Sequence, residues 1–84
     1  MTDEKLLLRL LRGSRNIRFE DLVRVARRFG FVETRVSGSH HIFERPGVVE
    51  ILNIQNVKGQ AKGYQVKQFL RIVEEYGLTL EEDR

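Results

Sequence analysis

The sequence predicts an α+β fold whose elements follow the order α-α-β-β-β-α. Apolar residues recur at helical spacing in the first 30 residues and again over residues 64–76, whereas between residues 31 and 54 they recur at a period of two. Glycine and proline mark the turns between these stretches. The three strands most simply form a three-stranded antiparallel sheet. The helices should cover one face of this sheet and leave the other in water.

The first two helices have recognisable ends. The first opens with Thr2 or Asp3 as its N-cap and stops at Gly13. The second begins near Phe19, after a polar link, and stops at Gly30. The apolar stripe of the first helix consists of Leu6, Leu7, Leu10 and Leu11. The inward face of the second consists of Phe19, Leu22, Val23, Ala26 and Phe29. Both helices are therefore expected to pack on a common core.

Three strands are expected after the second helix. Their ranges are 31–37, 40–45 and 48–54. Gly38 and Ser39 form the turn between the first two, and Pro46 and Gly47 form the next turn. The third range is rich in β-branched residues, which favour strands. The three ranges therefore predict an antiparallel meander.

A helix over residues 64–76 is expected to close the fold, after a loop over residues 55–63. Gly77 ends this helix, and Leu78 can close a hydrophobic cap behind it. Its apolar stripe consists of Val66, Phe69, Leu70, Val73 and Tyr76. This spacing is typical of a helix that lies across a sheet.

Size and composition exclude several classes of protein. A chain of 84 residues holds one small core, so we expect a single domain over residues 1–84. The absence of cysteine excludes a disulfide scaffold, and two histidines without a carboxylate cluster make a poor zinc site. We therefore expect no metal and no other cofactor. The leucine-rich N-terminus is too short to span a membrane and lacks a signal-peptide cleavage site, which predicts a cytoplasmic protein without membrane contact.

The distribution of charge predicts a polyanionic partner. The net charge is +3, but residues 74–84 hold five acids against Arg84, so residues 1–73 carry +7. An excess of this size on a small body favours binding of a polyanion, although it does not distinguish RNA, DNA and an acidic protein. A domain this small often gains stability from an oligomer or a complex.

The only two histidines of the chain, His40 and His41, stand where the first turn meets the second strand. Histidine has an unperturbed pKa of about 6.5, so it exchanges a proton near neutral pH. Alternate residues of a strand face opposite sides, and Phe43 is the large apolar group of this strand. We therefore expect His41 on the core side with Phe43, and His40 on the open side. The alternative is that both histidines are ordinary surface or structural residues.

The segment Gly-Ser-His-His-Ile-Phe, residues 38 to 43, follows a helix and a strand start at Gly30 and Phe31. In this it resembles the HicA family of toxins from bacterial and archaeal toxin-antitoxin pairs. The resemblance covers roughly residues 19–78, which leaves residues 1–18 as an N-terminal helical extension and residues 79–84 as an acidic tail. It implies a small fold similar to double-stranded-RNA-binding domains. The implied activity is a metal-independent endoribonuclease that cuts messenger RNA until a HicB antitoxin covers its active site.

The resemblance also implies roles for single residues. The catalytic histidine of the family maps to His40, and His41 is a supporting or alternative catalytic residue next to the motif turn of Gly38 and Ser39. Three lysines are candidates for binding RNA phosphates, two in the loop and one on the last helix, whose N-terminus also offers free amides. They are Lys58, Lys62 and Lys67. The alternative is that these lysines belong to a solvated loop and helix face.

Two other functions stay open at this point. The chain could be a non-catalytic RNA-binding module of the same fold, in which His40 is only a surface contact. The first two helices could instead be a helix-turn-helix that reads DNA through Arg24, Arg27 and Arg28, although complementation of the helix dipole explains these arginines and the link between the helices is long for this motif. A homodimer and a toxin-antitoxin hetero-oligomer are both expected forms of assembly.

Overall fold

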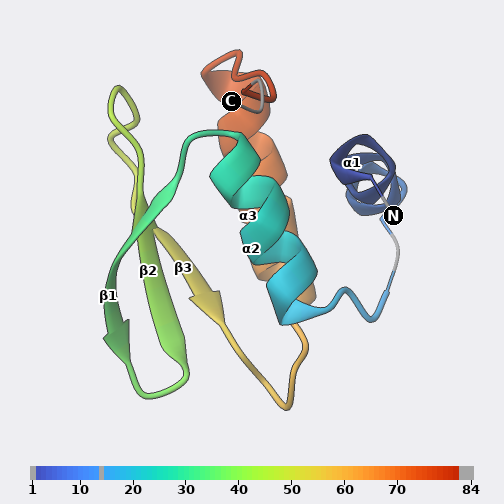
Figure 1. The fold of residues 1–84 in the computed structure, drawn as a ribbon, viewed down its shortest axis with the longest axis vertical. Coiled ribbons are helices and arrows are strands. Elements are labelled where there is room, and N and C mark those ends of the chain that lie inside the picture. The colour runs from blue at the N-terminus through green and yellow to red at the C-terminus, as the bar shows by residue number, and fades with distance from the viewer. Residues whose placement is uncertain (1, 14, 82–84) are drawn as a thin grey trace.

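The computed structural model describes residues 2–13 and 15–81 and confirms the predicted fold class (Figure 1). Its elements are α1 (Asp3–Leu11), α2 (Phe19–Arg28), β1 (Val32–Ser37), β2 (His40–Glu44), β3 (Leu52–Gln55) and α3 (Gly63–Glu75). The strands form one sheet in the order β1-β2-β3, and both neighbouring pairs are antiparallel. The α-α-β-β-β-α order and the meander are therefore as the sequence predicts.

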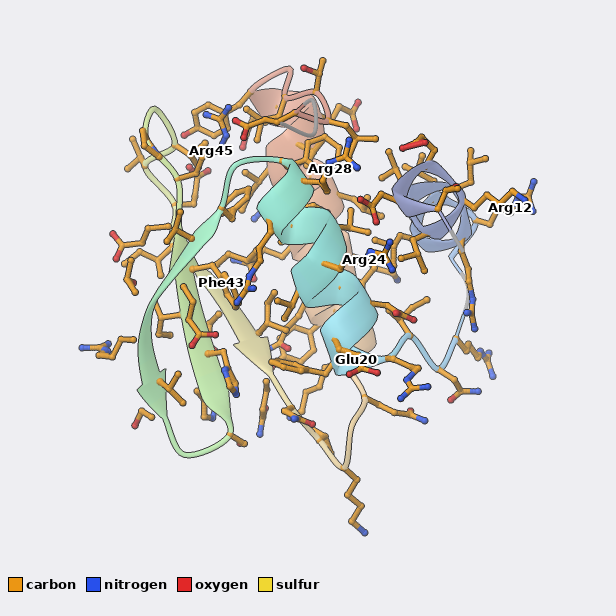
Figure 2. The ribbon with its side chains drawn as sticks, viewed as in Figure 1. Arg12, Glu20, Arg24, Arg28, Phe43 and Arg45 are labelled. Carbon is orange, nitrogen blue, oxygen red and sulfur yellow. The ribbon has the colours of Figure 1, made fainter. Side chains whose placement is uncertain are left out.

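The elements form layers, with the sheet on one side, α2 and α3 next to it, and α1 beyond them (Figure 1). Both α2 and α3 contact β3, whereas α1 packs against α2 and α3. The core between these layers is apolar, and Figure 2 shows Phe43 reaching into it from β2. Its largest fully buried side chains are Phe31, Phe43, Phe69, Leu22, Leu52, Ile54, Ile72 and Val25. Among the described residues, no helix covers the other face of the sheet, so the strand residues that face it meet solvent.

The third strand is shorter than the sequence predicts. Pairing with β2 begins at Leu52, opposite Phe43, so residues 48–51 are not part of the sheet. The Val49 N–H instead donates to the Tyr76 hydroxyl at 3.4 Å, and that hydroxyl donates to the Glu50 carboxylate at 2.5 Å. Val49 is 88% exposed, so its β-branched side chain lacks the packing against neighbouring strand residues that favours such residues in a sheet. The end of α3 therefore contacts this segment, which does not pair with β2.

The position of Tyr76 also differs from the prediction. It was expected to end the apolar stripe of α3, but it is the C-cap residue and is 37% exposed. Its hydrogen bond lowers the pKa of the Glu50 carboxyl, and the same bond raises the pKa of the Tyr76 hydroxyl. Ile72 and Gln65 are the buried residues of α3 that the stripe omitted. Tyr76 therefore ties a loop to the helix and does not fill the core.

Helix α1 is held against α2 by a charged contact. The Thr2 hydroxyl accepts from the Lys5 N–H and caps the helix. Asp3, in the first turn, lies 2.5 Å from both the Arg24 and the Arg28 guanidinium. Figure 2 shows these two arginines reaching from α2 towards α1. Arg24 and Arg28 therefore do more than complement a helix dipole, because both form ion pairs with Asp3.

Candidate functional site

The motif turn is joined to the end of β3. Gly38 has a φ of +58°, a left-handed conformation that glycine adopts without strain, and this lets the chain reverse between β1 and β2. The Ser39 carbonyl accepts from the Asn56 N–H at 2.8 Å, and the Ser39 hydroxyl accepts from the Gln55 side-chain amide at 3.4 Å. The turn and the loop that follows β3 consequently lie at one end of the molecule, the lower end in Figure 1.

His40 lies on the open face of the sheet, as strand parity predicts. It is exposed, and its Cα partners are Ser37 on β1 and Gln55 on β3. The next row on the same face consists of Arg35, Ile42 and Asn53. The side chain of Ile42 on this face is half-buried. We use the name open face for these two rows of three residues. It carries a histidine, an arginine, an isoleucine and three neutral polar side chains.

Asn53 fixes the chemistry of the His40 ring. The Nδ1 atom of His40 lies 3.2 Å from Oδ1 of Asn53. An amide oxygen only accepts hydrogen bonds, so with Oδ1 facing the ring this contact forms in the neutral tautomer that has its proton on Nδ1. The lone pair is then on Nε2, the ring nitrogen that Asn53 does not contact. This is the arrangement that a histidine needs in order to take a proton from a substrate.

His41 lies on the opposite face, under the helices. Its ring is 4.6 Å from the Phe19 ring of α2, measured between centroids, and its Nδ1 atom is 3.2 Å from a Glu33 carboxylate oxygen. Its side chain is 22% exposed. The contact that orients His40 comes from Asn53, so the structure separates the two histidines and does not bring His41 to the same site.

The three predicted lysines are not gathered at one point. Lys58 is exposed in the loop after β3, with a φ of +52°, and Lys62 is the N-cap residue of α3, its Nζ atom 5.8 Å from the centre of the Tyr64 ring. The loop between β3 and α3, to which both residues belong, lies at the same lower end as the turn between β1 and β2 (Figure 1). Lys67 lines the hollow between α1 and α3, next to Leu10 and Leu70. The structure therefore places Lys58 in the loop after β3, Lys62 at the start of α3, and Lys67 further along α3 beside the hollow next to α1.

Two open-face residues were missed by the sequence analysis, Asn53 and Arg35. Asn53 could be found only from the register of β3, because nothing in the sequence sets which residue lies beside His40. Arg35 lies in a strand with a register shift between Glu33 and Arg35. Simple alternation would put both residues on one face, whereas the shift pairs Glu33 with Phe43 and Arg35 with Ile42. The bulge therefore leaves Arg35 on the face of His40 and removes Glu33 from it.

A second hollow lies between α1, α3 and the segment after α3. It has a volume of ≈ 730 Å³ and is lined mainly by leucine and valine side chains, with Lys67 and Arg71 at its side. Neither histidine lines it. Among the described residues, no group of three or more histidine, cysteine or acidic side chains is placed to hold a metal ion. Within the same residues, no helix is long and apolar enough to cross a membrane.

Comparison with known proteins agrees with the motif. A search of curated proteins returned no match. A family model described as the HicA toxin of bacterial toxin-antitoxin systems matches residues 19–75, which is more than half of the chain and runs from the start of α2 to the end of α3. The matched region contains the motif turn and both rows of the open face. The chain therefore belongs to the HicA toxin family, as the toxin of a toxin-antitoxin pair whose partner is an antitoxin protein.

Proposed function

We propose that this toxin is an endoribonuclease that cuts messenger RNA without a metal ion, with Nε2 of His40 as the general base. The observation that carries the proposal is the exposed His40 ring on the open face, held through Nδ1 by Asn53 at 3.2 Å. A base must reach the substrate and must present a lone pair to it, and this ring meets both needs. Membership of the HicA family supports the choice of RNA as substrate.

The reaction follows from the chemistry of RNA. Nε2 takes the proton of a ribose 2′-hydroxyl, the 2′-oxygen bonds to the adjacent phosphorus, and the bond between phosphorus and the 5′-oxygen breaks. The leaving 5′-oxygen takes a proton from water, and the imidazolium returns its proton to the solvent. The products are a 2′,3′-cyclic phosphate and a free 5′-hydroxyl. An RNA with a 2′-deoxyribose at the cut position is therefore expected to resist cleavage.

The lysines of the loop would hold the RNA strand beside this base. Lys58 and Lys62 lie on the side of the motif turn and are proposed to bind phosphates on either side of the cut, together with the exposed amides at the start of α3. Lys67, in the hollow beside α1, contributes charge and no contact to the nucleotide that is cut. We propose that the HicB-like antitoxin covers the open face in the cytoplasm and so blocks access to His40.

Replacement of His40 tests the proposal. His40→Gln keeps a neutral polar side chain but removes the base, so the rate of RNA cleavage should fall by about 10²- to 10⁴-fold and growth arrest should be lost. The measurement is single-turnover cleavage of an RNA that the wild-type protein cuts, with thermal unfolding as the check on folding. A His40→Gln protein that cuts RNA at the wild-type rate would exclude His40 as the base.

His41→Gln is the matched control for this experiment. Because His41 contacts Phe19 and Glu33 on the helix side, its replacement should lower the unfolding temperature and leave the cleavage rate of the folded protein largely unchanged. Loss of cleavage in His41→Gln with normal folding would instead make His41 the catalytic histidine. If the wild-type protein binds RNA but does not cut it, the alternative of a non-catalytic RNA-binding module is favoured.

A further inference from the structure

We propose that Arg35 is the catalytic cation of this site and binds the phosphate that is cut, on the open face beside His40. This inference rests on the proposed function and adds to it the group that stabilises the phosphate. A metal-free ribonuclease needs such a group, because negative charge increases on the phosphate oxygens during the reaction. The candidate lysines lie in the loop and on α3, whereas Arg35 belongs to the same sheet face as the base.

The register of the sheet places Arg35 within reach. His40 pairs with Ser37, and Arg35 is two residues before Ser37 on β1, so its side chain leaves the same face one row away. Diagonal neighbours on one face of an antiparallel pair are roughly 7–8 Å apart. That spacing leaves room for a phosphate between an imidazole and a guanidinium, each of which makes contacts near 3 Å.

Arg35 is also available for a ligand. It is exposed, and among residues 2–13 and 15–81 no carboxylate forms an ion pair with it and no hydrogen bond of its side chain is present. The nearest acid on this face of the β1–β2 pair is Glu44, in the following row, and it accepts a hydrogen bond from the Thr34 hydroxyl at 2.7 Å. Glu33 faces the other side and contacts His41. The bulge thus separates the arginine from the acid nearest to it in the strand.

The chemistry of arginine suits this position. A guanidinium stays charged at all physiological pH values and presents paired donors that match two oxygens of one phosphate. The other residues of the open face near His40, namely Ser37, Gln55 and Asn53, are uncharged, so within the described part of the chain no acid in these two rows competes with the phosphate for Arg35. Asn53 holds one side of the His40 ring from β3, and Arg35 approaches from β1 on the opposite side of β2. The substrate phosphate would lie between base and cation.

Three variants test the proposal. Arg35→Gln removes the positive charge, and Arg35→Lys keeps the charge but lacks the paired donors of the guanidinium. Arg27→Gln is the matched control, because Arg27 is an exposed arginine near the C-terminal end of α2. We expect single-turnover cleavage to fall by about 10²- to 10³-fold in Arg35→Gln. Arg35→Lys should recover part of this loss, and Arg27→Gln should cut RNA within about twofold of wild type. Equal rates in Arg35→Gln and Arg27→Gln would overturn the proposal.

A binding measurement separates this inference from the role of His40. In the His40→Gln background, the affinity for an RNA that wild type cuts should fall when Arg35→Gln is added and should not change when Arg27→Gln is added. If Arg35→Gln changes neither RNA binding in the His40→Gln background nor RNA cleavage when it is the single substitution, Arg35 is not part of the site. Should His40→Gln prove fully active while Arg35→Gln is not, the base is wrongly assigned and the phosphate contact stands. If His40→Gln is inactive while Arg35→Gln is active, the base is correctly assigned and Arg35 does not bind the phosphate that is cut.

Discussion

At the scale of single residues, the contact between Asn53 and Nδ1 of His40 favours the tautomer that has its lone pair on Nε2. Its amide oxygen is 3.2 Å from Nδ1 of His40. Asn53→Ala removes this bond, and loss of one neutral hydrogen bond of about 1 kcal/mol corresponds to a decrease in the cleavage rate of about tenfold or less. The decrease should appear in the single-turnover rate and not in the affinity for RNA. Thr34→Ala, which removes the hydrogen bond from Thr34 to Glu44 between β1 and β2, is the matched control.

Asn53→Asp gives a test that a purely structural role of Asn53 would not pass. A carboxylate beside the ring stabilises the imidazolium, and the base works only when the imidazole is neutral. The acid limb of the pH profile of cleavage should therefore move to higher pH than in wild type. Arg35 is the charged neighbour on this face, and it is the same in both proteins. An unshifted acid limb would show that Asn53 does not act on His40 during the reaction.

At the scale of elements, the contact of Asp3 with α2 is expected to determine how firmly α1 is attached. Burial by itself would raise the pKa of the Asp3 carboxyl, but the hydrogen bond from Arg28 and the charges of Arg24 and Arg28 outweigh it and lower the pKa below 3.8. Asp3→Asn should reduce the free energy of unfolding at pH 7 by about 1–3 kcal/mol, because the carboxylate that accepts from two partly exposed guanidinium groups loses its charge. Glu4→Gln, in the same helical turn but exposed, is the control.

The pH dependence of this contact has a defined sign. The folded-state pKa of Asp3 is lower than the unfolded-state value, so its contribution is fully present above about pH 3.8 and is lost as the pH falls through the folded-state pKa. The difference in urea unfolding between wild type and Asp3→Asn should therefore shrink in acid below this pH. A difference that stays constant down to the acid unfolding of the protein would mean that Asp3 acts through packing and not through its charge.

At the scale of the whole molecule, the charge distribution predicts how RNA binding responds to salt. Residues 1–73 carry +7, yet only Arg35, Lys58 and Lys62 are assigned to phosphates here. About three such contacts with a single strand correspond to a slope of about −2 in a plot of log affinity against log salt concentration. Arg35→Gln should make this slope shallower by about 0.7. A much steeper slope would indicate that other arginines of the body also bind the RNA.

Much of the fold was predictable from local sequence patterns. A few residues show which features were not predictable in this way. Gly13, Gly30 and Gly77 mark helix ends, and all three have positive φ values in the structure. Residues 48–51 have the composition of a strand but do not pair with β2, and Tyr76, far along the chain, forms hydrogen bonds with that segment instead. Val25 is fully buried, although the predicted stripe of α2 omitted it. Local periodicity does not show which neighbours arrive from distant parts of the chain.

The sequence by itself determined the order of the elements, the meander, the motif turn and the side of the sheet to which His40 belongs. These depend on periodicity and on glycine conformations, which are local properties. The tertiary structure alone decided that Asn53 contacts the His40 ring, that Arg35 shares its face and that Asp3 joins α1 to α2. The physical reason is that strand register, a bulge and helix packing bring together residues whose separation along the chain says nothing about their distance in space.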